Sequence, residues 1–269
     1  MEAISRQEGK EIQLRLLKEF ASICEQHGLN YYLAYGTMLG AVRHKGFIPW
    51  DDDIDVYMDR PEYERLICLL RDPVVNKPEW MELLDLESEG YFYPFAKVTD
   101  GRTIARMENN KTEHGIWIDV FPIDTLPAEP KKSANFEKFC FFLRDVIISM
   151  TTDFSSKNLY SWKNTLKRRV LCFGAQLIGK KRIARFYDHF CRKYNGVESD
   201  YAGCLFSAYG SRDRFLRKVL FEKGSYSFEE DSFCGPRFYD EYLKTLYSDY
   251  MTPPPVEKRT THHIDAHWK

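Results

Sequence analysis

One stretch of the sequence, residues 35–55, constrains the fold more than any other. A Gly-Thr pair that could open a helix precedes four closely spaced acids, Asp51, Asp52, Asp53 and Asp55, and apolar residues flank the acids on both sides. Carboxylates this dense repel one another unless a cation lies among them. The stretch therefore predicts a compact folded unit that binds a divalent metal ion.

The four acids are not equivalent. Residues 53–58 alternate acidic or aromatic with apolar side chains, which is the period of a strand with one face on a core. Asp53 and Asp55 then point to the same side and Asp52 to the other. Asp51 precedes the strand, and we predict that it either lies near the metal or binds backbone donors in the turn.

A third carboxylate is expected from a neighbouring strand. Residues 115–121 have the apolar pattern of a buried strand with a single acid, Asp119, where an unpaired charge would be costly. Asp124 lies just beyond this predicted strand and is the second choice. Asp53, Asp55 and Asp119 together form the arrangement that holds Mg²⁺ against a phosphate, with Mn²⁺ as the alternative ion.

Other residues near this site could bind phosphate. A glycine at position 36 allows close approach of the backbone, and Thr37 would add a hydroxyl at the start of the helix predicted over residues 38–44. Arg43, Lys45 and Lys97 could neutralise phosphate oxygens. For the first two cations, the alternative is an ordinary interaction with the helix dipole.

The remaining patterns predict an α+β fold, in which a sheet carries helices on one face, with an added basic helical region. We predict a catalytic core over residues 1–126, a basic, mostly helical region over 127–200 and a C-terminal segment over 201–269 that packs back on the core. That segment is expected to hold a helix over 238–250 and to end in a polar tail with His262, His263 and His267.

Composition limits the partners. Acidic and basic residues number 40 and 39, so no overall charge favours nucleic acid. The seven cysteines show no paired spacing and are expected to be reduced. The sequence shows no signal peptide and no apolar run that spans a bilayer, so we predict a cytoplasmic protein. The basic region is either solvated or rests peripherally on anionic lipid at the inner membrane face.

The run from Gly36 to Asp55 resembles the signature of the LicD family, which also includes fukutin and the fukutin-related protein. Three further stretches resemble the same family: residues 95–100, residues 117–124, and residues 242–251 with the prolines that follow. The resemblance covers nearly the whole chain and is weakest across the basic helical region.

This resemblance implies a nucleotidyltransferase-like fold, a mixed sheet flanked by helices. It also implies a Mg²⁺-dependent phosphotransferase that moves a phospho-alcohol from a CDP-alcohol to a glycan hydroxyl and releases CMP. Phosphocholine is associated with bacterial members, so CDP-choline is the expected donor. The expected acceptor is a cell-surface glycan, lipid-linked or not, such as a lipopolysaccharide or teichoic acid precursor. The family's metal-binding acids correspond to Asp51, Asp53 and Asp55, and its downstream acid, a candidate base, to Asp119. The zinc-binding cysteines of the fukutin-related protein have no counterpart here, so no zinc is expected.

Two alternatives remain open at this point. A true nucleotidyltransferase would use the same metal site to attach NMP from an NTP, and a non-catalytic choline- or glycan-binding protein would need no metal. The aromatic residues that would surround a choline head group are also undecided. Residues 91–93 and Trp117 lie in predicted strands near the site, where aromatic side chains commonly belong to the core.

Overall fold

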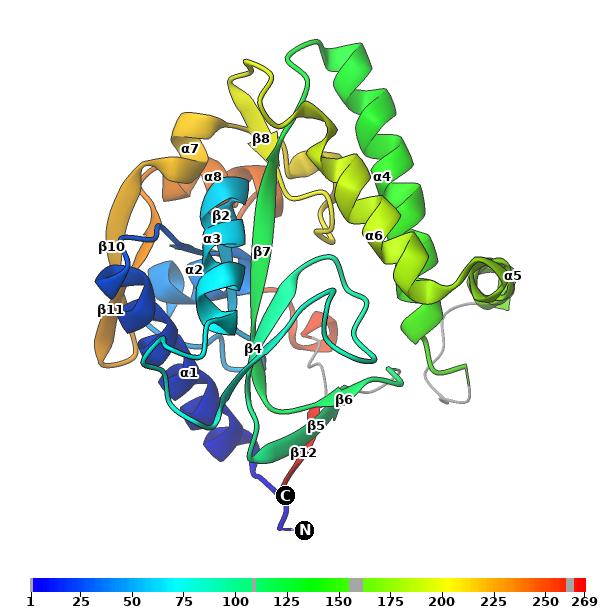
Figure 1. Cartoon of the computed structure of the whole chain (residues 1–269). Coiled ribbons are helices and arrows are strands. Elements are labelled where there is room, and N and C mark those ends of the chain that lie inside the picture. The colour runs from blue at the N-terminus through cyan, green and yellow to red at the C-terminus, as the bar shows by residue number, and fades with distance from the viewer. Residues whose placement is uncertain (1, 108–109, 155–161, 260–263) are drawn as a thin grey trace.

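The computed structural model describes residues 2–107, 110–154, 162–259 and 264–269, and a mixed β-sheet forms its centre (Figure 1). The strands run in the order β1 (Tyr32–Leu33), β2 (Asp55–Asp59), β7 (Trp117–Thr125), β4 (Ala96–Asp100) and β3 (Met81–Leu84), and β8 (Tyr201–Gly203) with β9 (Phe215–Leu216) continues from the end of β7. Only β2 and β7 pair in parallel among the neighbours in this sheet's described strands. The predicted α+β class with a mixed sheet flanked by helices is confirmed.

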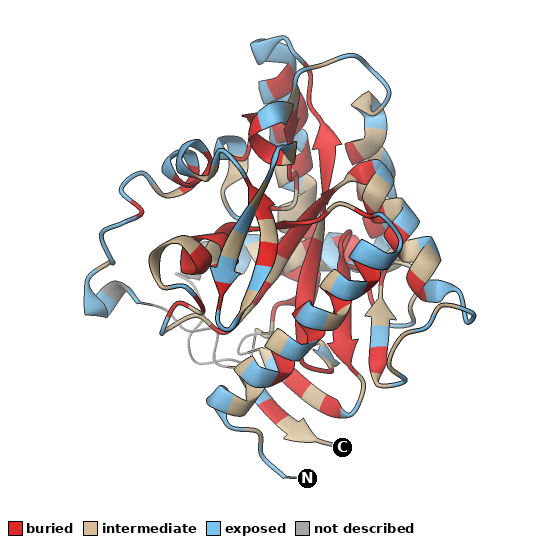
Figure 2. Ribbon diagram, turned by 90° about the vertical axis from the view of Figure 1, so that its left-hand side faces the viewer, coloured by how far each residue is buried: buried red, intermediate tan, exposed pale blue. Residues whose placement is uncertain are grey.

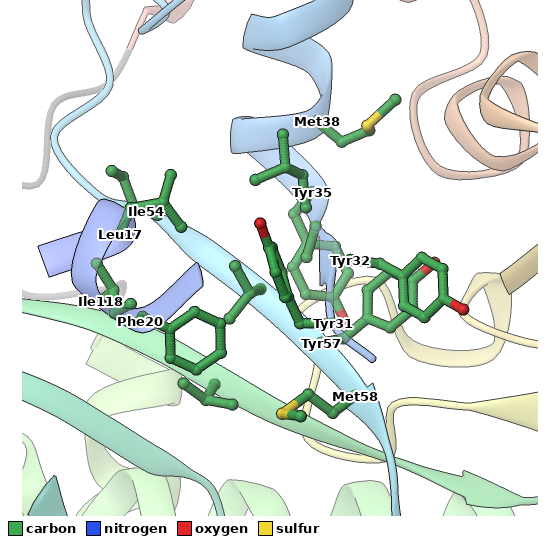
Figure 3. Packing of buried hydrophobic residues seen from close by; sticks show 14 of the residues in the cluster. Leu17, Phe20, Tyr31, Tyr32, Tyr35, Met38, Ile54, Tyr57, Met58 and Ile118 are labelled. Atoms are coloured by element: carbon green, nitrogen blue, oxygen red, sulfur yellow. The ribbon is translucent and has the colours of Figure 1, made fainter. Parts of the chain in front are cut away.

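Helix α1 (Arg6–Gln26) packs one face on this sheet. Its buried residues include Ile12, Leu16 and Phe20, whose spacing of four residues is that of an amphipathic helix. Ser5 caps the helix by accepting a hydrogen bond from the Glu8 amide. The outer face of α1 is exposed in Figure 2, and its inner face meets the large core that Figure 3 shows from close by.

Two further helices flank the strand that carries the acidic motif. Helix α2 (Tyr35–Arg43) precedes it and helix α3 (Arg60–Arg71) follows it. Asp59 caps α3 by accepting a hydrogen bond from the Arg60 amide, and Pro61 lies in the first turn, as the sequence predicted. The strand contacts the first turn of α2 at Asp55, whose amide donates to the Thr37 hydroxyl, and leads directly into α3 after Asp59.

The region predicted to be basic and helical is helical. It contains α4 (Pro130–Thr151), α5 (Trp162–Ile178), α6 (Lys180–Cys191) and the short 3₁₀ helix η1 (Arg192–Tyr194). Its buried residues form a second apolar cluster that includes Phe136, Ile147 and Tyr187. Figure 1 shows α5 at the outer edge of the molecule, beyond α4 and α6. None of the helices in the described part of the chain is both long and apolar enough to cross a bilayer.

The C-terminal segment holds more strands than the sequence predicted. Its elements are η2 (Gly210–Arg212), α7 (Arg217–Phe221), the hairpin β10 (Lys223–Phe228) and β11 (Asp231–Pro236), α8 (Tyr239–Tyr247) and η3 (Val256–Lys258). The hairpin packs against β1 and α2, and α8 also contacts α2. The three domain boundaries drawn from the sequence stay predictions.

The expectation of a polar tail at the end of the chain is wrong for residues 264–268. They form strand β12 (Ile264–Trp268), which pairs with β5 (Thr103–Met107), itself paired with β6 (Glu113–His114). The alternation of Ile264, Ala266 and Trp268 has the period of a strand and explains the pairing. His267 lies in this strand, whereas His262 and His263 lie outside the described residues.

Candidate active site

Three residues on three neighbouring strands form one row across the sheet. Asp55 on β2 lies opposite Asp119 on β7, and Asp119 lies opposite Lys97 on β4. Residues in register on adjacent strands point to the same face. The pairing of β2 with β7 therefore brings together two carboxylates that are 64 residues apart in the sequence.

The Asp119 carboxylate is held by two donors. The Lys97 ammonium lies 2.5 Å from its Oδ1, and the Trp117 indole N–H donates to its Oδ2 at 3.1 Å. Lys97 is buried and also lies 4.3 Å from the centre of the Trp117 ring. A carboxylate has about four lone-pair sites, so Asp119 keeps acceptor capacity toward the cavity.

The Gly-Thr pair lies inside α2 and does not precede it, because the helix begins at Tyr35. Thr37 is buried, and its hydroxyl oxygen accepts a hydrogen bond of 2.8 Å from the Asp55 amide. A Cβ atom at Gly36 would overlap the Asp51 carboxylate. Both residues thus position the acidic segment, and Gly36 also lines the cavity whereas Thr37 is not among the lining residues.

A cavity of about 800 Å³ contains the predicted acidic cluster. The described residues that line it include four of the acids in question, Asp51, Asp53, Asp55 and Asp119. Asp52 points elsewhere, forms an ion pair with Arg6 and lines a separate small pocket under α1. Asp52 therefore points away from the side chains of Asp53 and Asp55, as the sequence predicted.

The acids in the cavity disfavour one another's charge. Burial, followed by the charges of Asp55 and Asp51, raises the pKa of Asp53 well above its usual range. Burial and the charge of Asp119 do the same to the pKa of Asp55, while the nearby ammonium of Lys97 opposes the shift. Such a cluster binds a cation favourably, since a positive charge removes the repulsion.

The donor set fits Mg²⁺. All the candidate ligands are carboxylate oxygens, the kind of ligand that this ion prefers. Within the described ranges, no three His, Cys, Asp or Glu side chains already surround a common point as a closed metal centre. In proteins Mg²⁺ usually binds one or two carboxylates and keeps its other positions for water and substrate phosphate.

The three predicted phosphate-binding cations occupy different environments. Arg43 lines the cavity, and its guanidinium donates to the Tyr250 carbonyl oxygen at 2.6 Å. Lys45 is exposed, has a φ of 61° and is absent from the cavity lining. Lys97 lies behind Asp119 and reaches the site through that carboxylate. Arg43 is the one basic residue among the described residues that line the cavity.

An aromatic wall borders the acids, and the sequence did not reveal it. We use this name for Tyr35, Phe95, Phe121, Phe206, Tyr209 and Tyr247, which all line the cavity. Their rings are in contact from one to the next, with centroid distances of 5.3 Å for Phe95 and Phe206, 4.6 Å for Phe95 and Phe121, and 5.2 Å for Tyr35 and Tyr209. Tyr209 and Tyr247 share a hydrogen bond of 2.5 Å between their hydroxyl groups.

Residues 91–93 and Trp117, considered from the sequence, are buried core residues outside this wall. The wall instead includes Phe206 and Tyr209, from the segment that follows β8, and Tyr247 at the end of α8. Three prolines, Pro253–Pro255, line the cavity beyond that helix. The resemblance of residues 242–251 to a known family was the one sequence signal for this side of the site.

Asp124 was the second choice for the third carboxylate and was placed just beyond the strand. It lies inside β7, and Arg60 binds both of its oxygens, at 2.8 and 2.6 Å. Asn195 donates to the same carboxylate at 2.7 Å. With its charge paired in this way and no place in the cavity lining, Asp124 has a structural role.

Comparison with known proteins identifies relatives of this chain. The family model described as LicD/FKTN/FKRP, nucleotidyltransferase domain, matches residues 28–161. The lipopolysaccharide cholinephosphotransferase LicD of Haemophilus influenzae is 32% identical over 270 aligned positions, which cover 98% of each chain. Uncharacterized proteins of Rickettsia prowazekii and Rickettsia typhi are each 43% identical over 42 residues, 16% of this chain and 16% or 14% of theirs.

Proposed function

The chain belongs to the LicD/FKTN/FKRP family, and from that premise we propose that it transfers phosphocholine from CDP-choline to a hydroxyl of lipopolysaccharide or a related glycan. It is a phosphotransferase. In the proposed reaction the acceptor hydroxyl oxygen attacks the phosphorus that bears choline. The bond from this phosphorus to the oxygen shared with the CMP phosphate breaks, and CMP leaves.

One observation carries the choice of phosphocholine, namely that the acids and the aromatic wall share one cavity. A quaternary ammonium is attracted to aromatic faces and to negative charge. A polyol such as ribitol or glycerol would need hydrogen-bond partners instead, which Phe95, Phe121 and Phe206 do not offer. The hydroxyl groups of Tyr209 and Tyr247 bind each other, which uses part of their hydrogen-bonding capacity.

The acids are proposed to serve the phosphates. Asp53 and Asp55, with Asp51, would hold Mg²⁺, which supplies charge stabilisation to the phosphoryl group when bound. Asp119 either shares this role or accepts the proton of the attacking hydroxyl. Arg43, which lines the cavity, would bind a donor phosphate, and Lys97, which binds the Asp119 carboxylate, would keep it oriented. The proposed roles of Gly36 and Thr37 are to position Asp51 and Asp55.

The reaction itself can be tested with purified protein, Mg²⁺ and a glycan acceptor that lacks phosphocholine. With labelled CDP-choline we expect CMP release and label on the glycan, and with NTPs we expect no pyrophosphate. Pyrophosphate from an NTP without CMP release would instead indicate a nucleotidyltransferase. Binding of choline without turnover in the presence of Mg²⁺ would indicate a binding protein.

The aromatic wall predicts donor specificity. Replacing Phe121 or Tyr209 by Leu is expected to raise KM for CDP-choline about tenfold, because each aromatic face contributes cation–π attraction. KM for CDP-glycerol, measured with the same proteins, should change much less. Phe238→Leu, a partly exposed ring that does not line the cavity, is the control. Equal losses with both donors would contradict a choline-binding role for the wall.

A further inference from the structure

Helix α5 presents an apolar stripe to solvent. Its members are Leu166, Val170, Phe173 and Leu177, whose spacing of four, three and four residues places them on one face of the helix. They are 56, 64, 66 and 76% exposed. Of the α5 side chains that the structure describes, only Ala175 is buried. The apolar face of an amphipathic helix normally packs on a core, but here it faces outward.

The helices beside α5 expose further large apolar side chains. Phe139 and Phe142 on α4 are 41 and 50% exposed, and Phe186 on α6 is 50% exposed. Both helices pack against α5. A contiguous exposed apolar surface usually marks an interaction site. All three helices of this region therefore expose large apolar side chains, and the stripe on α5 is the most exposed of them.

The charge around the stripe identifies the kind of partner. Helix α5 carries four basic residues and no acid, and α6 carries four basic residues and one acid. That acid, Asp188, is already engaged by Arg60 and Arg192. Acids on neighbouring elements pair with two of the eight cations, Asp145 with Lys167 and Glu87 with Arg185, and the positive charge remains in excess. Arg169 on α5 and Arg182 in the first turn of α6 are exposed. A second copy of this chain would bring the same positive charge to the contact and would be repelled.

We infer that the α5 stripe and the surrounding basic residues bind the surface of a membrane that contains anionic lipid. A helix with aromatic and aliphatic side chains on one face and Lys or Arg on the other is typical of segments that lie in the bilayer interface. The apolar side chains would enter the acyl boundary while the cations contact lipid phosphates. This inference does not depend on phosphocholine transfer, although a lipid-linked acceptor would lie at the same surface.

Sedimentation with vesicles tests the inference. The wild-type protein is expected to bind vesicles of phosphatidylcholine mixed with phosphatidylglycerol and to bind pure phosphatidylcholine much more weakly. Leu177→Ser should weaken binding to the mixed vesicles about tenfold, because one large apolar side chain no longer leaves water. Arg169→Gln combined with Arg182→Gln should also weaken it about tenfold, and added salt should remove the difference.

Val74→Ser is the matched control, since Val74 is 87% exposed but lies far along the chain from α5. It should bind vesicles like wild type, and all variants should keep wild-type circular dichroism and transfer to a soluble acceptor. Absence of binding by the wild type, or equal binding by Leu177→Ser, would overturn the inference. So would a wild-type dimer in solution that Leu177→Ser abolishes, because it would assign the stripe to a second copy.

Discussion

Asp55→Asn is expected to lower kcat for phosphocholine transfer by about a thousandfold or more, because one of the charges proposed to hold Mg²⁺ against the donor is lost. The amide has nearly the same shape as the carboxylate, so the fold should persist. Asp53→Asn should behave in the same way. The measurement is CMP release under saturating donor and Mg²⁺.

The same substitution should leave the protein as stable as wild type or more stable. Burial and the charge of Asp119 raise the pKa of Asp55 in the folded state, which means that folding disfavours its charged form at neutral pH. An uncharged amide removes that penalty. Activity should therefore fall, while the melting temperature, measured without added metal, should stay the same or rise. This trade-off is common for residues selected for function.

Asp52→Asn provides the matched control for this prediction. Asp52 lies three residues before Asp55 and is buried, but it pairs with Arg6 outside the cavity. Its replacement should change kcat by less than about threefold, and any effect should be on stability, because a partly buried ion pair is lost. Retention of a tenth of the activity by Asp55→Asn, or an equal loss in Asp52→Asn, would contradict the assignment.

Arg60→Leu is expected to lower the free energy of unfolding by about 3–5 kcal/mol, because it leaves a buried carboxylate without its charged partner. Arg60 and Asp124 have side chains only 6 and 2% exposed. The guanidinium also donates to Asp188 on α6 at 3.0 Å. Arg60, on α3, therefore links this helix to β7 and to the basic helical region. Urea unfolding monitored by circular dichroism measures the change.

Arg65→Leu tests whether this effect belongs to the buried network. Arg65 lies on the same helix, is exposed and pairs with Glu62 one turn away. Its loss should change the free energy of unfolding by no more than about 0.5 kcal/mol. Replacing Arg60 and Asp124 together by apolar residues should recover part of the stability lost in Arg60→Leu, since no lone charge remains. Similar losses in Arg65→Leu and Arg60→Leu would rule out the proposed cause.

The parts of the site that local pattern determines were predictable. The alternation of residues 53–58 and the single acid in a buried strand pointed to Asp55 and Asp119, and β2 and β7 do pair them in register. Local pattern also separated Asp52 from its neighbours. It misplaced the start of α2, because nothing near Gly36 revealed that Tyr35 begins the helix with a φ of 42°.

The parts that depend on tertiary contacts were not predictable. Phe206 and Tyr209 reach the acids only because β8 pairs with the far end of β7. Asp124 could not be recognised as structural without Arg60, which lies 64 residues earlier in the chain. In the same way, residues 264–268 are a strand because β5 offers them an edge.

The prolines beside the cavity, Pro253–Pro255, bear on how the donor binds. A proline ring fixes φ near about −65°, and Pro255 has φ −51° and ψ 149°, as in an extended polyproline segment. A proline segment of this kind has few alternative conformations before the donor binds. The segment therefore loses little conformational entropy when the donor binds. As a result, more of the free energy of its contacts with the donor contributes to binding affinity.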